Sequence, residues 1–221
     1  IRRPFDIKRA NPLGAFKSIT QLPDLGRFMI ISFVISLAFF VYPSVWAYFG
    51  KLQFGWGPGM IGLSLGAFGI GIAIVQGLLM RPILNKIGER NAVVLGLSVD
   101  VLAFIMLGFV TNGWIALALT PFTALGSIAG PALQGIMSRT AADNQQGELQ
   151  GALTSINAVA TIMAPLLMTQ LFFYFTHESA PAYLPGAPFL FSAVLTFGAV
   201  LIFIPVRKSI PPRTETTNEV G

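Results

Sequence analysis

Asp100 is the residue of this chain whose position points most directly to chemistry. It lies at the centre of an apolar run, residues 91–110, whereas every other acid falls near the end of a run, in a loop or in a tail. A carboxylate at the mid-plane of a bilayer costs about 2.5–3.5 kcal/mol on insertion scales, so it usually faces a polar interior and has a function. Because a low-dielectric setting disfavours the ionised form, we expect Asp100 to exchange a proton near neutral pH. This favours a role for Asp100 in proton or solute transport. The simpler alternative is a structural acid whose hydrogen bonds are satisfied by a neighbouring helix.

Other polar side chains inside apolar runs could line a cavity together with Asp100. Amide and hydroxyl groups of this kind are Gln76, Gln134, Ser155, Asn157, Thr161 and Gln170. Each can hydrogen-bond across helices, so helix packing is the alternative interpretation of every one. We expect the wall of a substrate cavity to be formed by Tyr42, Trp46, Gln76, Gln134 and Asn157.

The sequence gives little support to enzymatic chemistry. Residues 62–66 match the G-x-S-x-G pattern of serine hydrolases, but that pattern needs a preceding strand and a nearby base. No strand is expected there, and the single histidine, His177, falls in a predicted loop. The chain has no cysteine, which excludes disulfides, thiolate metal sites and cysteine nucleophiles. We therefore expect no enzyme, no cofactor and no metal site.

The elements that position Asp100 are predicted to be membrane-spanning helices. The chain is 54% hydrophobic and only 10% charged, with a mean hydropathy of +0.72, whereas about 25% of the residues of a soluble domain are charged. A helix that crosses a bilayer needs about 20 apolar residues. Six segments meet that length: 26–49, 60–80, 91–110, 114–138, 149–175 and 187–206. The fold class is therefore all-α and membrane-embedded.

Domain organisation and orientation follow from where the charges lie. Residues 1–23 are interpreted as the end of a cytoplasmic linker, 24–209 as the transmembrane domain and 210–221 as a flexible cytoplasmic tail. With six spans, 13 of the 14 Lys and Arg residues lie on the side of the two termini, and only Lys51 lies opposite. The positive-inside rule then places both ends of this segment in the cytoplasm. The opening residues lack both Met and a signal-peptide pattern, so we expect a part of a longer protein.

Small residues and proline predict details of helix packing. Gly62 and Gly66 on the second span, and Gly147 and Gly151 at the start of the fifth, have the spacing that permits close helix contacts. Pro165 is expected to kink the fifth span, because it cannot donate the usual backbone hydrogen bond.

Four sequence blocks resemble tetracycline-resistance efflux proteins, in the drug:proton antiporter branch of the major facilitator superfamily. They are IGLSLGAFGI at 61–70, IGERNAVVLGLSVD at 87–100, PALQGIMSR at 131–139 and GELQGALTS at 147–155. They keep the order and spacing of the C-terminal half of that family. The resemblance implies that the six spans are helices seven to twelve of a twelve-helix transporter, with substrate bound between two six-helix halves.

The resemblance also implies roles for individual residues. Asp100 falls on the acid of the ninth helix that the family uses in coupling, and Gln76 matches a glutamine of the eighth. In RPILNKIGER (81–90), Lys86, Gly88 and Arg90 match a basic cytoplasmic loop motif, and Arg81 and Asn85 replace its Gly and Asp. Many tetracycline exporters carry a histidine where this chain has Ile72, so tetracycline itself is less strongly implied than the fold.

These observations together predict half of a drug efflux antiporter of the bacterial inner membrane, conferring antibiotic resistance. Its expected partners are an amphipathic drug, protons, the lipid bilayer and the N-terminal six-helix half, with no nucleic acid. A self-contained homodimer of six-helix chains is one alternative, and a non-transporting receptor or assembly protein is another. The exact drug, a divalent metal carried with it and the oligomeric state are left open by the sequence.

Overall fold

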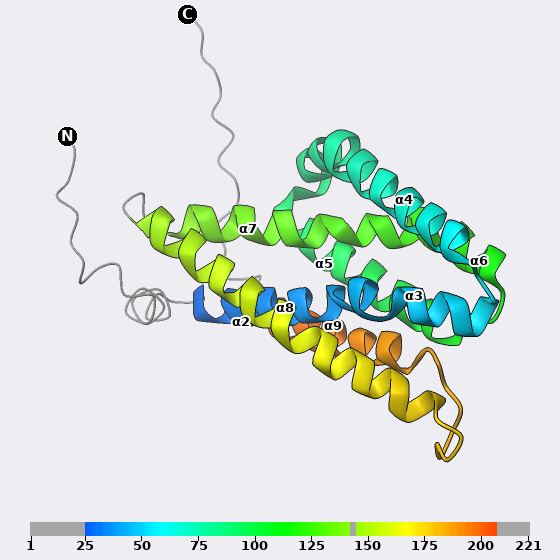
Figure 1. Cartoon of the computed structure of the whole chain (residues 1–221). Coiled ribbons are helices and arrows are strands. Elements are labelled where there is room, and N and C mark those ends of the chain that lie inside the picture. The colour runs from blue at the N-terminus through cyan, green and yellow to red at the C-terminus, as the bar shows by residue number, and fades with distance from the viewer. Residues whose placement is uncertain (1–24, 142–144, 207–221) are drawn as a thin grey trace, which may run out of the picture.

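The computed structural model describes residues 25–141 and 145–206, and the predicted linker and tail lie outside this part. No strand occurs in the described residues, and apolar helices account for nearly all of them (Figure 1). The helices are α2 (Leu25–Phe39), α3 (Val41–Phe54), α4 (Pro58–Ile74), the π-helical segment η1 (Val75–Leu79), α5 (Met80–Phe109), α6 (Gly113–Leu125), the 3₁₀ segment η2 (Gly126–Ile128), α7 (Ala129–Thr140), α8 (Gln146–Thr176) and α9 (Ala187–Val206). The all-α membrane class is confirmed.

These helices form five continuous segments that are long and apolar enough to cross a membrane. They are Leu25–Phe54, Pro58–Phe109, Gly113–Thr140, Gln146–Thr176 and Ala187–Pro205. The prediction of six separate segments is wrong in this respect, because residues 81–90, expected as a loop, are helical. The second segment has 52 residues, which corresponds to about 78 Å of helix. That length is more than twice a bilayer core of about 30 Å, and Figure 1 shows that the chain reverses direction between α4 and the apolar part of α5.

Gly88 is where the long second segment changes direction. Its backbone angles, φ 74° and ψ 161°, are not helical, and helix lies on both sides of it within α5. This region of backbone space is accessible almost only to glycine. Gly88 therefore allows a sharp reversal between α4 and the apolar part of α5 without a loop of irregular backbone.

We predict that Gly88→Ala destabilises the full-length protein by about 1–3 kcal/mol, the usual cost of forcing a side chain into this region. The measurement is the Tm in detergent. Gly77→Ala is the matched control, because nothing lies within 4 Å of a Cβ built at Gly77 and its φ is not positive. Equal Tm values for the two variants would contradict the role of Gly88 in the turn.

Glycine, proline and asparagine residues shape the turns between the other segments. Gly55 ends α3 in a left-handed conformation with φ 68°, which suits glycine. Pro58 stands at the first turn of α4, where a missing N–H costs nothing. The Asn112 side chain accepts a hydrogen bond of 2.9 Å from the Trp114 N–H and so caps α6. These signals are local, so the sequence alone could place them.

Buried side chains form two clusters, one toward each end of the helices. The cluster nearer the start of α2 contains Phe28, Leu97 and Phe203, and the aromatic cluster toward the 55–57 loop contains Phe49 and Phe104. α5 and α9 pack against each other at the centre, and α4 packs on α6. Asp100 falls between Leu97 and Phe104 on α5, so it lies at the boundary of the two clusters.

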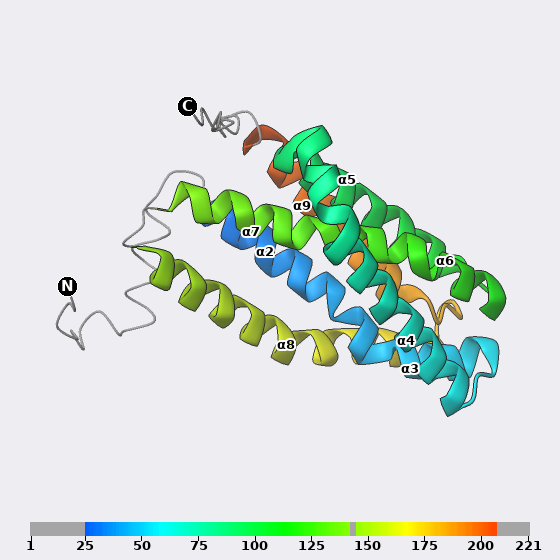
Figure 2. The same cartoon turned by 90° about the horizontal axis from the view of Figure 1, so that it is seen from above.

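α8 is the least buried of the long segments and lies along one side of the others (Figure 2). It packs mainly on α2 and α3, and it continues as a helix through Pro165, so the expected kink stays a prediction. A Cβ built at Gly62, Gly66, Gly147 or Gly151 meets nothing within 4 Å. The two small-residue pairs therefore make no close helix contact within the described residues, and their faces on α4 and α8 are open.

Candidate functional site

The carboxyl group of Asp100 lies against the backbone of η2, a segment of the third membrane-spanning run. A Cβ added at Gly126 would overlap its Oδ1 atom. One turn earlier on α5, a Cβ at Gly96 would come within 2.7 Å of the Ala129 backbone nitrogen. Glycine at 96 and 126 thus lets α5 and η2 approach closely, and the close approach leaves the carboxyl group of Asp100 against the Gly126 backbone.

The carboxyl group of Asp100 is half-buried and has no fixed partner. In the described part of the chain it takes part in no hydrogen bond and no ion pair. A buried acid paired with a cation would be held permanently ionised. Asp100 lacks such a cation, so it can gain or lose a proton, or bind a cationic group, without breaking an existing ion pair.

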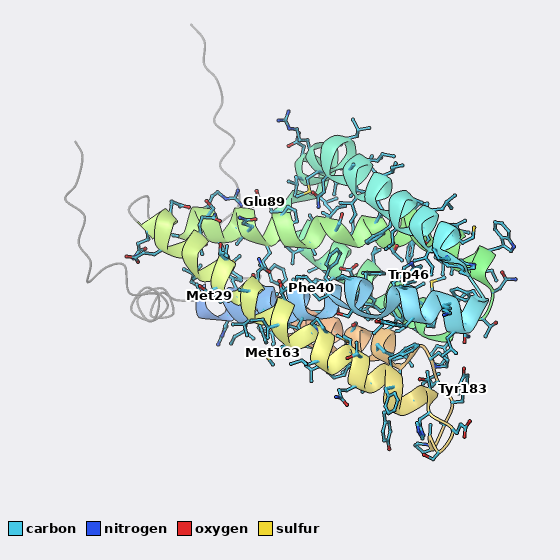
Figure 3. The ribbon with its side chains drawn as sticks, in the orientation of Figure 1. Met29, Phe40, Trp46, Glu89, Met163 and Tyr183 are labelled. Carbon is cyan, nitrogen blue, oxygen red and sulfur yellow. The ribbon has the colours of Figure 1, made fainter. Side chains whose placement is uncertain are left out.

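Tyr42 and Trp46, two of the expected cavity residues, lie together in the aromatic cluster. Tyr42 is 8% exposed and Trp46 is 6% exposed, and their ring centroids are 6.2 Å apart. Figure 3 places Trp46 inside the bundle, where α3 faces α4 and α6. The Trp46 ring is buried in protein rather than placed at a membrane interface. The indole N–H donates a 2.9 Å hydrogen bond to the Ser64 Oγ, which explains its inward position.

Ser64 has a structural environment rather than that of a nucleophile. It is 2% exposed, accepts the hydrogen bond from Trp46, and donates its own proton to the Ile61 carbonyl over 2.7 Å. His177 follows α8 and contacts the Ser179 hydroxyl at 3.0 Å, so it does not act as a base for Ser64. The serine-hydrolase pattern has no supporting geometry here.

The remaining expected cavity residues lie on exposed faces of three different helices. Gln76 is on η1, Gln134 on α7 and Asn157 on α8, and all three are exposed. Gln134 donates to the Gln150 side chain over 3.3 Å, and Asn157 accepts from the Ser36 hydroxyl over 2.6 Å. These contacts fix two of the amides, but they do not bring Gln76, Gln134 and Asn157 into a single enclosed pocket with Tyr42 and Trp46.

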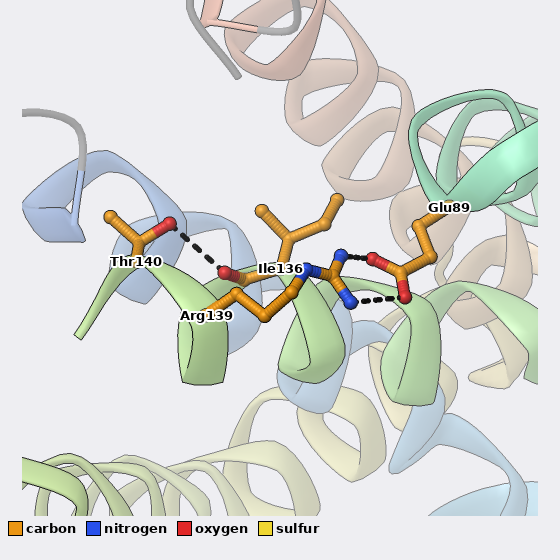
Figure 4. Close-up of polar contacts among 4 residues, drawn as sticks. All are labelled: Glu89, Ile136, Arg139 and Thr140. Atoms are coloured by element: carbon orange, nitrogen blue, oxygen red, sulfur yellow. Dashed lines mark hydrogen bonds and ion pairs between the residues drawn. The ribbon is translucent and has the colours of Figure 1, made fainter. Parts of the chain in front are cut away.

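The expected cytoplasmic loop motif is a charged surface next to the end of α7. Arg81 and Lys86 are exposed, and Arg90 is half-buried with one guanidinium nitrogen that has no hydrogen-bond partner. Glu89, which the sequence did not single out, forms a bidentate ion pair with Arg139 of α7 (Figure 4). The side chain of Glu89 is only 12% exposed, so the pair fixes the 88–90 turn to α7.

Gly126, Thr120 and Thr123 are site residues that the sequence did not reveal. Thr120 and Thr123 are 6% and 5% exposed and face the same region as Tyr42. Their spacing of three residues on one helix was a usable signal, because it places both hydroxyls on one face. Gly126 carried no such signal, since its importance comes from a contact with a residue on another helix.

Comparison with known proteins agrees with this arrangement. The profile of the Major Facilitator Superfamily matches residues 28–220. The chain is 34% identical to the class C tetracycline resistance protein of Escherichia coli over 171 residues, 77% of this chain and 43% of that protein. It is 36% identical to the class B protein of Escherichia coli over 154 residues, 70% of this chain and 38% of that protein.

A more distant similarity covers nearly the whole chain. The human Hippocampus abundant transcript 1 protein is 25% identical over 240 residues, 96% of this chain and 48% of that protein. The chain thus spans about half the length of the curated relatives it matches, or less. The extent of the profile match, together with helices that are apolar and multi-pass, shows that the chain belongs to the Major Facilitator Superfamily.

Proposed function

We propose that this chain is the C-terminal half of a drug efflux transporter that exchanges a tetracycline-like compound for protons. The observation that carries the proposal is the seat of Asp100, an acid in the middle of an apolar helix with no cation paired to it in the described residues. An exchanger needs a group that holds either a proton or a cationic solute, and Asp100 can do both in turn. The similarity to tetracycline resistance proteins of classes C and B supports the choice of substrate.

The second half of the transporter is part of the proposal. Substrates of such folds bind near the mid-plane between two halves, which rock about the site to give alternating access. The open faces of α4 and α8, which carry Gly62, Gly66 and Gly151, have no neighbour in the described chain. We expect an N-terminal six-helix half to cover them. In this arrangement the present chain crosses the membrane six times, and the long segment Pro58–Phe109 supplies two of these crossings.

We assign the contacts with the drug to polar side chains that are exposed. Gln76, Gln134 and Asn157 lie on faces that the drug or the second half can reach. Tyr42 and Trp46 are buried, so they support the wall of the cavity from behind in this conformation. The charge distribution favours a bacterial inner membrane orientation with the Arg81, Lys86 and Arg139 end in the cytoplasm.

A drug-accumulation assay with the intact gene tests the proposed function. Cells that express it should hold less tetracycline than cells with an empty vector, and collapse of the proton gradient by an uncoupler should remove the difference. The uncoupler is applied to both strains, so its direct effects on uptake cancel. Equal accumulation in the two strains, or a difference that survives the uncoupler, would contradict proton-coupled export.

A further inference from the structure

The first half of α8 carries an uncharged polar stripe. Its members repeat at intervals of four, three and four residues, so they lie on one face of the helix. They are Gln150, Thr154, Asn157 and Thr161, here called the α8 stripe, and all four side chains are exposed. Thr161 is the central residue of α8, so the stripe runs from near the start of the helix to the interior of the membrane.

The α8 stripe lies between a buried face of the helix and an exposed apolar face. Ile156 belongs to the buried face. On the other side of the stripe, Val159, Ile162 and Leu166 are 47%, 67% and 63% exposed, which suits contact with lipid chains. An amide such as that of Asn157 finds no hydrogen-bond partner among lipid chains, and this makes such a contact costly. We therefore expect the α8 stripe to face a polar space rather than lipid.

Two neighbouring helices turn polar side chains toward the α8 stripe. α2 packs on both α7 and α8 and lies between them (Figure 2). The Ser36 hydroxyl of α2 donates to the Asn157 side-chain oxygen over 2.6 Å. The Gln134 amide of α7 donates to the Gln150 side-chain oxygen over 3.3 Å. The stripe therefore faces the side of the bundle where α2 and α7 lie, and all three helices contribute polar groups there.

The α8 stripe retains hydrogen-bonding capacity for a ligand. The Thr154 and Thr161 hydroxyls donate to the carbonyls of Gln150 and Asn157 over 2.8 and 2.7 Å, and each hydroxyl oxygen keeps lone pairs that can accept. In the described chain the amide nitrogen of Asn157 donates to no group. The stripe thus offers both acceptors and a donor, and it carries no charge.

We propose that the α8 stripe binds an uncharged, oxygen-rich edge of the exported drug. The proposal rests on the proposed function and deepens it, because it names the part of the drug that this half holds. Hydroxyl groups of the drug donate to Thr154 and Thr161, and a carbonyl group accepts from Asn157. The stripe is about 16 Å long, so a multi-ring compound contacts more than one of its residues at once.

Single cysteines in the full-length transporter test where the stripe faces. This chain has no cysteine, so labelling above that of the unmodified transporter reports the introduced thiol. In inverted membrane vesicles, Thr154→Cys and Thr161→Cys should react with a membrane-impermeant maleimide. Tetracycline at ten times its KM should slow this labelling about tenfold, the factor by which occupancy reduces the free protein.

Ser155→Cys is the matched control for these cysteines. The Ser155 hydroxyl donates to the Gly151 carbonyl over 2.9 Å, as the threonines of the stripe do to carbonyls one turn earlier, but it lies about 100° around the helix from Thr154. Its thiol should stay unlabelled. Equal labelling of Ser155→Cys and the two stripe cysteines, or no labelling of any of them, would overturn the proposal.

Valine substitutions test the contact with the drug itself. Thr154→Val and Thr161→Val each remove a hydroxyl at nearly constant volume, and each should raise the KM for tetracycline about twofold to tenfold, the loss expected for one hydrogen bond. The maximal rate and the Tm should stay the same. Ser155→Ala should change none of these values. An unchanged KM in both valine variants, with labelling that tetracycline does not slow, would overturn the proposal.

Failure of the stripe can be told from failure of the proposed function. If cells export tetracycline but the drug neither slows labelling nor loses affinity in the valine variants, the exporter stands and the stripe is not its contact. If tetracycline slows labelling but cells do not export it, the stripe binds the drug and the proposed exchange is wrong. If there is neither export nor slowed labelling, both are wrong.

Discussion

Asp100→Asn in the full-length transporter should abolish drug-driven proton exchange while leaving the protein folded. Asparagine has nearly the shape of aspartate, so it fits the seat against Gly126, but it cannot bind or release a proton. Loss of a proton-transfer group typically costs about 10²–10⁴-fold, which would bring the exchange to background. Because the variant also removes a costly intramembrane charge, we expect the Tm in detergent to be unchanged or raised.

The measurement is proton movement in inverted membrane vesicles, followed with a pH-sensitive dye when tetracycline is added. Glu178→Gln is the matched control, since it neutralises an exposed acid in the loop after α8. It should behave as the unmodified transporter. Exchange at the normal rate in Asp100→Asn, with normal expression, would remove the coupling role and with it the proposed mechanism.

Asp100 could be found from the sequence because its signal is one of composition. An ionisable residue in a long apolar run is unfavourable wherever the run lies in the bilayer, so no tertiary information is needed. The same holds for the helix ends at Gly55 and Asn112, where the residue types determine backbone conformation locally. These features depend on a few neighbouring residues, so residue types alone suffice to find them.

The sequence was less informative wherever the answer depends on which helix lies opposite. Trp46 suits a membrane interface and a protein core equally well by its chemistry, and only the position of Ser64 on α4 decides between them. The loop expected at 81–90 is helical on both sides of Gly88. The chain turns at this single glycine, so no stretch of irregular backbone is needed. In each case the deciding group is a partner or a backbone angle that residue types alone do not specify.

Gly126→Ala should lose most of the exchange activity although it leaves Asp100 chemically intact. The added methyl would occupy the position of the Asp100 Oδ1 atom, so the carboxyl group must rotate away or α5 and η2 must separate. Either response displaces the acid from its position against Gly126. Overpacking of this kind typically costs about 1–3 kcal/mol, so a lower Tm is expected together with the loss of exchange, again measured in inverted vesicles.

Gly130→Ala is the control for Gly126→Ala, because it lies one turn further on and a Cβ there meets nothing within 4 Å. It should keep both activity and Tm. A second substitution shows whether the acid itself is the obstacle. Asp100→Ala in the Gly126→Ala background removes the overlapping atoms, so the Tm should recover while the exchange stays absent, a coupling expected only for side chains in contact. If Asp100→Ala lowers the Tm equally with glycine or alanine at 126, the two residues are not in contact, and the seat does not position the acid.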